Sequence, residues 1–367
     1  MRIDQVLPAF VERDAIGNHT RHIRETLLGV GIDSDIYYLN ASSEAMGISK
    51  HISELTMASD DRYLLYHSSI GSPVVDQLLD QRDPIIIDYH NITPARFFEK
   101  WIPGTGNETL LGRRQLSQLV AKSVLGLADS AYNERELIDV GYRPTAVAPL
   151  LIDIDRDPPV NSELLEQRSE ERSKRDAPSL MFVGTLSPHK APHELVAMLA
   201  AYRTLYNPRA TLDLVGRPFG GRYLGALHGY IHALGLDDAV NIAGSISSAD
   251  LEAYWRTTDV FVCASNHEGF CVPIIEAMGH DVPVVAYGAA AVPETVGGAG
   301  FVIPDKAPIP FAAAIHRVVI DEALRRQFNR AAVVQRTQYE LANSSKKFLE
   351  VLLTGLDQSA QYRAETT

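Results

Sequence analysis

Cysteine is scarce in this sequence, and the two residues present, Cys263 and Cys271, are too few for a disulfide framework. They form no CxxC pair, and no Cys/His spacing typical of a metal site occurs. Basic residues are also in deficit, because 34 Lys and Arg oppose 46 Asp and Glu to give a formal net charge of −12. This composition favours a reducing cytosol and argues against nucleic acid as a partner.

Long apolar runs are absent as well. No stretch of eighteen apolar residues occurs, and MRIDQVLPAF lacks the pattern of a secretion signal. We therefore expect a cytoplasmic protein. Segment 110–126 is predicted as an amphipathic helix in which Arg113, Arg114 and Lys122 are available to lipid phosphates. The inner face of the membrane is thus an alternative location, whereas the simpler interpretation is an ordinary surface helix.

What the sequence has is an alternation of short apolar, β-branched runs with helical patterns, which is typical of parallel α/β architecture. Its 367 residues suit two domains. The strands predicted in the first half are 37–39, 63–66, 85–88 and 146–150. After a charged, proline-containing stretch the alternation restarts, with strands predicted at 180–184, 211–216, 240–244, 259–263 and 283–287.

The expected fold class is therefore α/β, with two doubly wound Rossmann-like domains facing a cleft. We assign residues 1–152 to the N-terminal domain and 153–178 to a linker containing a short helix. Residues 179–340 form the second domain, and residues 341–367 form a C-terminal helix and tail.

The segment 266–286, NHEGFCVPIIEAMGHDVPVVA, carries the strongest chemical signal. A strand is predicted to end at Cys263, and Pro273 is predicted in the first turn of the next helix, whose N-terminus attracts phosphate. Glu268 on the loop and Glu276 in that first turn then lie at the carboxyl ends of the strands, where such sheets bind ligands. One carboxylate would hold a ribose and the other a hexose. The alternative interpretation is that Glu268 and Glu276 are two surface carboxylates that flank an ordinary helix start.

This segment resembles the E-x7-E signature of family 4 retaining glycosyltransferases with the GT-B fold, and the resemblance extends over about residues 7 to 340. It implies that Lys190, in VGTLSPHKAPHELVAML, grips the donor diphosphate. The family's arginine position is Thr185, a departure that Arg217 would offset. Asp281 and Cys271 both stand where the family usually has glycine, and a catalytic thiol is the alternative role for Cys271.

The resemblance implies further contacts in both domains. The backbone of Ile246 would lie at the nucleotide base, Gly17 would face the donor phosphates, and His90, in DYHNITP, would contact the donor sugar. A structural histidine is the alternative for His90. The predicted catalytic residues are Glu268 and His90, and the predicted donor-binding residues are Gly17, Gly184, Thr185, Lys190, Arg217, Ile246, Gly269, Phe270, Cys271, Val272 and Glu276.

The implied reaction is transfer of a hexose from a nucleotide sugar to a saccharide or lipid-linked acceptor in glycan or polysaccharide biosynthesis, with retention and without metal or cofactor. GDP-mannose is the donor that we favour. His189 and His193 lack an evident third ligand, so no metal site is expected. The alternatives are a sugar phosphorylase or nucleotide-sugar epimerase of the same fold, and a non-catalytic nucleotide-sugar-binding subunit. The motifs carry no indication of oligomeric state.

Overall fold

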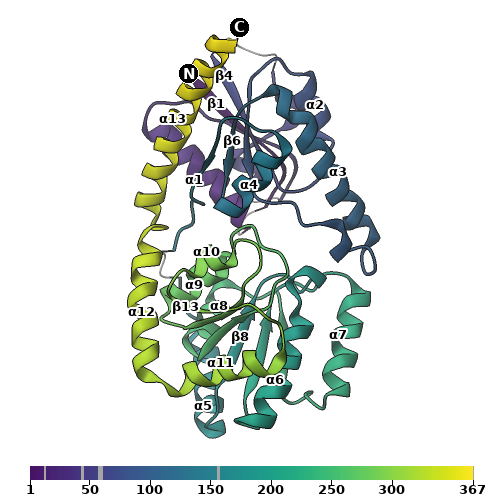
Figure 1. Cartoon of the computed structure of the whole chain (residues 1–367), viewed down its shortest axis with the longest axis vertical. Helices are drawn as coiled ribbons and strands as arrows, with labels where there is room; N and C mark the ends of the chain where they lie inside the picture. The colour runs from purple at the N-terminus through teal and green to yellow at the C-terminus, as the bar shows by residue number, and fades with distance from the viewer. Residues whose placement is uncertain (12–13, 43–44, 57–60, 155–157, 367) are drawn as a thin grey trace. The chain divides into compact units, whose positions relative to one another are not determined.

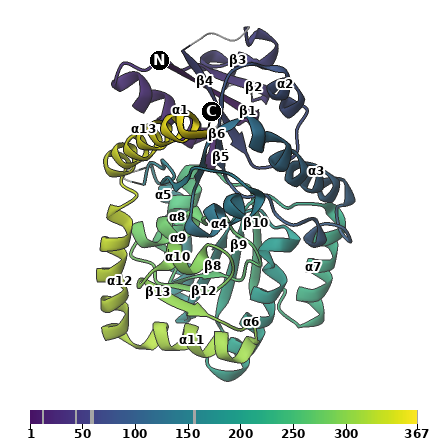
Figure 2. The same cartoon turned by 45° about the horizontal axis from the view of Figure 1, so that its top comes forward.

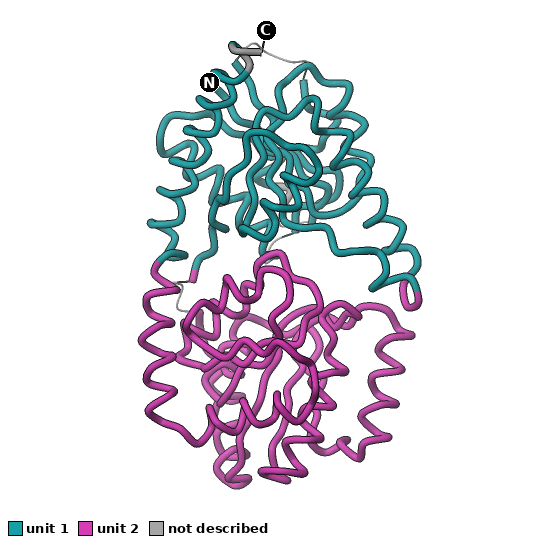
Figure 3. The backbone as a smooth tube through the Cα atoms, in the orientation of Figure 1, with its two compact units in different colours: residues 1–99, 103–153, 338–367 teal, residues 100–102, 154–337 magenta. Residues whose placement is uncertain are grey.

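The computed structural model describes residues 1–11, 14–42, 45–56, 61–154 and 158–366, and the chain divides into two compact units. Figure 3 colours unit 1 (residues 1–99, 103–153 and 338–367) and unit 2 (residues 100–102 and 154–337) separately. Each unit contains one parallel β-sheet covered by helices, as Figures 1 and 2 show. The predicted class, two Rossmann-like α/β domains, is confirmed.

Unit 1 is built on a seven-stranded sheet of order β3-β2-β1-β4-β5-β6-β7. All of its strand pairs are parallel, and β4 and β5 are buried along almost their whole length, as sheets covered on both faces require. The strand order reverses between β1 and β4, and such a reversal is where open α/β sheets generally bind ligands. The strands are β1 (Arg2–Phe10), β2 (Ile36–Ala41), β3 (Lys50–His51), β4 (Arg62–Ser68), β5 (Ile85–Tyr89), β6 (Ser123–Ala128) and β7 (Thr145–Val147).

The last helix of the chain belongs to unit 1. Phe348, Leu352 and Leu356 of α13 are buried in one core with Ile23 and Leu125, and both views show α13 beside α1. The α-helices of unit 1 are α1 (Ala15–Gly29), α2 (Val74–Asp80), α3 (Pro103–Leu119), α4 (Ala131–Val140) and α13 (Leu341–Thr366). Its 3-10 helices are η1 (Ala45–Ile48), η2 (Ile52–Glu54), η3 (Ala95–Phe97) and η4 (Val120–Lys122).

The helix predicted over 110–126 lies earlier in the chain in the structure, where α3 begins at Pro103. It ends at Leu119, and the prediction was wrong beyond that point because Ser123–Ala128 is the buried strand β6. Lys122 donates to the carbonyl oxygens of Leu79 and Gln81, so this amine is engaged within unit 1. Across the described part of the chain, no helix is both long enough and apolar enough to cross a bilayer.

Unit 2 is built on a six-stranded parallel sheet of order β10-β9-β8-β11-β12-β13, whose order reverses between β8 and β11. The strands are β8 (Ser179–Val183), β9 (Thr211–Val215), β10 (Val240–Gly244), β11 (Val260–Cys263), β12 (Val284–Tyr287) and β13 (Gly300–Ile303). The helices are α5 (Ser162–Arg175), η5 (Pro188–Lys190), α6 (Pro192–Leu205), α7 (Gly221–Ala233), α8 (Ser248–Arg256), α9 (Val272–Gly279), α10 (Val292–Val296), α11 (Pro308–Ile320) and α12 (Glu322–Thr337).

The stretch 153–178, expected as a linker with a short helix, is mostly part of unit 2. Asn161 caps α5 by accepting the Leu164 N–H. Arg168 of α5 is 2.8 Å from Asp213 of β9 and lies over the Tyr254 ring. Helix α5 therefore packs against α8 and reaches β9 through Arg168, and residues 155–157 of the expected linker lie outside the described residues.

The packing of α13 on unit 1 generates a stability prediction. Phe348 is fully buried, so Phe348→Ala should lower the free energy of unfolding by about 3–5 kcal/mol through lost burial and the cavity left behind. Urea unfolding followed by circular dichroism would measure this change. Leu353→Ala is the matched control on the same helix, because Leu353 is 37% exposed and should cost less than about 1 kcal/mol. Equal costs for the two variants would contradict this packing.

Candidate functional site

The candidate site of unit 2 lies in the loops that follow β8 and β11, the two strands between which the order reverses. Lys190 lies at the end of the first loop and Glu268 on the second, and Lys190 Nζ is 2.5 Å from Glu268 Oε2. Burial lowers the pKa of Lys190, but the Glu268 carboxylate outweighs that effect and the net pKa is raised. Both residues were predicted at the site, whereas their direct pairing was not.

Hydrogen bonds from the backbone and from the Lys306 side chain hold these two loops in place. The Asn266 N–H donates to the His189 carbonyl oxygen over 2.7 Å, which ties the second loop to the first. Lys306 donates to Asn266 Oδ1 over 2.9 Å and to the Ala264 carbonyl oxygen. Lys306 was missed from the sequence, because a single lysine after the predicted strand pattern carries no distinguishing signal.

The start of α9 has the features predicted for an anion site. Pro273 lies in its first turn, and the first amides of an α-helix have no partner four residues earlier. Cys271 precedes the helix with a φ of 82°. Glycine adopts this left-handed conformation readily, whereas cysteine is strained in it. Gly269 and Val272 are half-buried beside it. The carbonyl oxygen of Phe270 accepts a hydrogen bond of 2.6 Å from the Thr295 hydroxyl. The positive end of the helix dipole therefore lies beside Lys190 and Glu268.

Glu276 lies in the second turn of α9, as its fifth residue, so its predicted position in the first turn was wrong by one turn. The side chain is half-buried, and within the described ranges its carboxylate has neither a hydrogen-bond partner nor an ion-pair partner. Burial raises the pKa of Glu276. A half-buried carboxylate without a protein partner is suited to accept hydrogen bonds from a ligand.

Thr185 and Arg217 lie at the carboxyl ends of neighbouring strands. The Leu186 N–H donates to the Arg217 carbonyl oxygen over 2.9 Å, which places the two loops side by side. Thr185 is half-buried and supplies no positive charge, whereas Arg217 is exposed and its guanidinium carbon is 5.8 Å from the centre of the Phe219 ring. Arg217 is therefore a positively charged residue in the loop next to Thr185, as the predicted compensation requires.

Gly184 and Ile246 complete the set of predicted residues in unit 2. A Cβ atom at Gly216 would lie only 2.1 Å from the Gly184 carbonyl oxygen, so the loops after β8 and β9 pass closely. Ile246 is half-buried between β10 and α8, one strand further along the sheet. The residues of unit 2 that were predicted to bind the donor thus all follow the carboxyl ends of β8, β9, β10 or β11.

The two cysteines of the chain contact each other beside Glu268. Their sulfur atoms lie within 4.8 Å of each other and of a Glu268 carboxylate oxygen. A hydrogen bond with Cys263, together with burial, raises the pKa of Cys271 well above its usual value. A neutral, buried thiol is a poor nucleophile, so this geometry weighs against a catalytic role for Cys271.

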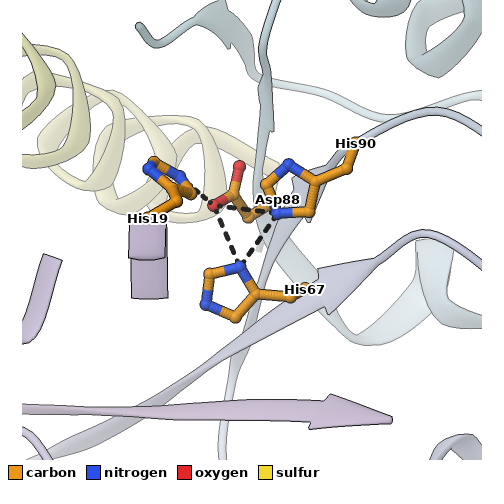
Figure 4. A group of neighbouring side chains, drawn as sticks. All are labelled: His19, His67, Asp88 and His90. Carbon is orange, nitrogen blue, oxygen red and sulfur yellow. Dashed lines mark hydrogen bonds and ion pairs between the residues drawn. The ribbon is translucent and has the colours of Figure 1, made fainter. Parts of the chain in front are cut away.

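The two residues predicted in unit 1, Gly17 and His90, both lie in tightly packed surroundings. Gly17 is the third residue of α1 rather than part of a loop, and a Cβ atom there would lie 2.2 Å from the Val11 carbonyl oxygen. His90 follows β5, with its side chain only 3% exposed. His90 Nδ1 is 3.0 Å from Asp129, and its Nε2 is 2.9 Å from His67 Nδ1 (Figure 4). Burial lowers the pKa of His90, but the Asp129 and Asp88 carboxylates outweigh it and raise the pKa to about 9.

Groups of side chains that could hold a metal ion occur twice among the described residues. One comprises His19, His67, Asp88 and His90, and the other comprises Cys263, Glu268 and Cys271. Neither contains His189 or His193. His193 Nδ1 instead contacts the Tyr223 hydroxyl at 2.8 Å.

The Lys190–Glu268 pair should be energetically coupled. Lys190→Met leaves the buried Glu268 carboxylate without its cation and should lower the free energy of unfolding by about 1–3 kcal/mol. Adding Glu268→Gln should restore at least half of this loss. Both tryptophans, Trp101 and Trp255, lie in unit 2, so fluorescence-detected urea unfolding reports on this unit. Additive effects in the double variant would contradict the pairing.

Glu276 should make unfolding depend on pH. Because burial raises its pKa in the folded state, its contribution is present below the unfolded pKa and is lost as pH rises through the folded value. Glu276→Gln should therefore raise the Tm at pH 8 by on the order of 2 °C, and this gain should vanish near pH 4. Thermal melts of both proteins across this range measure the difference. A gain in Tm that is independent of pH would contradict a raised pKa of Glu276 in the folded protein.

Sequence comparison relates part of this chain to known glycosyltransferases. Residues 165–334, a little under half of the chain, match the family described as glycosyl transferases group 1. A D-inositol 3-phosphate glycosyltransferase of Kineococcus radiotolerans is 28% identical over 62% of this chain and 56% of its own. A GDP-mannose-dependent alpha-(1-6)-phosphatidylinositol monomannoside mannosyltransferase of Mycobacterium tuberculosis is 30% identical over 46% of this chain and 45% of its own. The matched region thus spans about half the length of these curated relatives.

Solved structures match almost the whole chain. HepE of Anabaena, in complex with UDP-glucose, superposes with a TM-score of 0.72 at 18% identity, covering 96% of this chain and 100% of its own. WaaG, a glycosyltransferase involved in lipopolysaccharide biosynthesis, has a TM-score of 0.64 at 13% identity and covers 94% and 98%. The chain therefore has the GT-B fold, and residues 165–334 are similar to glycosyl transferases group 1.

Proposed function

We propose that this chain is a retaining, metal-independent hexosyltransferase that takes its sugar from a nucleotide-sugar donor bound mainly by unit 2. The observation that carries this proposal is the Lys190–Glu268 pair in the loops that follow β8 and β11, together with the unpartnered Glu276 carboxylate in the second turn of α9. All three residues lie within the region that matches glycosyl transferases group 1.

The diphosphate would be bound by Lys190 and by the backbone amides of Phe270, Cys271 and Val272, with Arg217 as a second cation. Since Lys190 is paired with Glu268 in the structure, an arriving diphosphate competes with Glu268 for the same ammonium group. Glu268 is then released toward the hydroxyls of the donor sugar, while Glu276 accepts from the ribose hydroxyls. Binding of the phosphates would thus prepare the sugar-binding carboxylate.

The bond that breaks joins the anomeric carbon to the donor phosphate, and the bond that forms joins the same carbon to an acceptor oxygen. Lys190 and the α9 dipole would stabilise the negative charge that develops on the departing diphosphate, in place of a metal ion. The Glu268 carboxylate would stabilise positive charge on the sugar ring. The acceptor proton would pass to the departing phosphate, so no side-chain base is required.

The donor that we propose is GDP-mannose, a choice that the name of the Mycobacterium tuberculosis relative supports. UDP-glucose is the competing donor, because HepE was solved with it. We assign acceptor binding mainly to unit 1, with a saccharide or a lipid-linked glycan as the acceptor and the inner membrane face as the place of reaction for the latter. Gly17 is proposed to assist from unit 1, whereas both ring nitrogens of His90 are engaged by Asp129 and His67.

The test is release of nucleoside diphosphate from GDP-mannose and UDP-glucose, with and without a panel of saccharide acceptors. Lys190→Gln should lower turnover by about 10²- to 10³-fold, because it removes a charge aimed at the leaving group. Lys174→Gln is the matched control, since Lys174 is 76% exposed on α5 and should leave turnover unchanged. Added Mg²⁺ or Mn²⁺ should not raise turnover.

Four outcomes would contradict this proposal. Turnover that requires inorganic phosphate would favour a phosphorylase, and interconversion of the nucleotide sugar without release would favour an epimerase. Binding without turnover for any acceptor would favour a non-catalytic subunit. Inversion at the anomeric carbon of the product, read by NMR, would contradict the retaining stereochemistry.

A further inference from the structure

Three imidazoles surround the carboxylate of Asp88 in unit 1 (Figure 4). Asp88 Oδ2 lies 3.0 Å from His19 Nε2, 3.3 Å from His67 Nδ1 and 3.6 Å from His90 Nε2. These side chains are at most 3% exposed and come from α1, β4, β5 and the residue after β5. They therefore gather beside the reversal of strand order between β1 and β4.

The hydrogen bonds of His67 fix which of its nitrogens carries a proton. His67 Nε2 is 3.0 Å from Gln5 Oε1, and the amide nitrogen of Gln5 donates to the Thr20 carbonyl oxygen. Gln5 therefore presents its acceptor to His67, whose Nε2 must carry the hydrogen. The neutral ring then directs the lone pair of Nδ1 toward Asp88 and His90.

His90 is fixed in the complementary way. Its Nδ1 lies 3.0 and 3.1 Å from the two Asp129 oxygens and must carry the hydrogen, which leaves Nε2 facing His67 and Asp88. A carboxylate on the far nitrogen is the usual partner of a metal-ligating histidine. The facing nitrogens of His67 and His90 are only 2.9 Å apart, and two lone pairs approach so closely only when a positive species lies between them. That species is either a second proton on His90, whose pKa is raised to about 9, or a metal ion.

His19 has a different role. The Leu151 N–H donates to His19 Nδ1 over 2.9 Å, so this nitrogen bears the lone pair and Nε2 bears the hydrogen. His19 therefore donates to Asp88 and orients its carboxylate. It is a positioning residue beside the candidate ligands rather than one of them.

We propose that His67 Nδ1, His90 Nε2 and Asp88 Oδ2 bind a divalent transition-metal ion, with Zn²⁺ as the best match, and leave a fourth position for water. Two imidazoles and one carboxylate are an established ligand set for zinc. Their mutual separations of 2.9, 3.3 and 3.6 Å bracket the value of about 3.3 Å expected between ligands of a tetrahedral zinc ion.

Charge favours the metal ion over a single shared proton. The cluster contains the buried carboxylates of Asp88 and Asp129, and a divalent ion balances both, whereas one proton balances only one. The rings of His67 and His90 are within 10° of parallel, so both must tilt for their lone pairs to converge on one ion. The site lies wholly in unit 1 and does not depend on the function proposed for unit 2.

The test uses the full chain without an affinity tag, loaded with Zn²⁺ and dialysed. Elemental analysis should give one zinc per chain, and titration calorimetry should give one site. His67→Gln and Asp88→Asn should each weaken binding by more than about 100-fold, and His19→Asn by about 10- to 100-fold. The control is His228→Gln with His232→Gln, an exposed pair four residues apart on α7, which should bind zinc as the unaltered chain does.

X-ray absorption at the zinc edge of the unaltered chain keeps the test decisive if a variant fails to fold. The expected first shell contains nitrogen and oxygen only, with the scattering pattern of two imidazoles. Sulfur in that shell would place the ion at Cys263 and Cys271 instead, and overturn the assignment. Absence of stoichiometric zinc, or binding that only the α7 variant abolishes, would overturn it as well and leave a cluster held together by protons.

Discussion

The reversal of strand order within each parallel sheet is the constraint on which the rest of this structure depends. Parallel strands covered on both faces must be apolar along their length, so polar groups are pushed to their ends. Where the order reverses, successive crossovers leave on opposite sides and a crevice opens at the carboxyl ends. Unit 1 reverses between β1 and β4 and unit 2 between β8 and β11, and each reversal has a buried polar cluster beside it.

The two clusters balance charge in different ways. In unit 2 the Glu268 carboxylate is matched by a lysine from the neighbouring loop, and this pair can open because Lys190 is 22% exposed. In unit 1 the carboxylates of Asp88 and Asp129 are matched only by imidazoles among their described ion-pair partners. The first arrangement is suited to exchange one anion for another, whereas the second is suited to hold a cation permanently.

Much of this organisation could be predicted from the sequence, because apolar runs at regular spacing report buried strands directly. The loop carrying Glu268 and the proline in the first turn of α9 were predicted from the same pattern. Strand β1 escaped notice because Asp4 and Gln5 interrupt its apolar run. Both side chains are fully buried, and Asp4 is paired with Arg2 while Gln5 contacts His67. Such partners come from tertiary structure and leave no trace in local sequence.

The histidine cluster shows the same limit at longer range. His19 and His90 are 71 residues apart, and only the pairing of β4 with β5 and the docking of α1 bring them together. The return of α13 to unit 1 was also outside what local patterns indicate, since its apolar face fits either domain equally well. Register, order of strands and docking of distant helices are set by packing.

The central claim, that unit 2 holds a nucleotide sugar through Glu276, is tested most directly by calorimetric titration of GDP-mannose and UDP-glucose. The account predicts that one of these ligands binds a single site, and that Glu276→Ala weakens it at least about tenfold because a charged hydrogen bond is lost. Glu163→Ala, on the exposed face of α5, should bind as the unaltered chain does. Equal affinity in the Glu276 variant, or no binding of either ligand at millimolar concentration, would contradict the account.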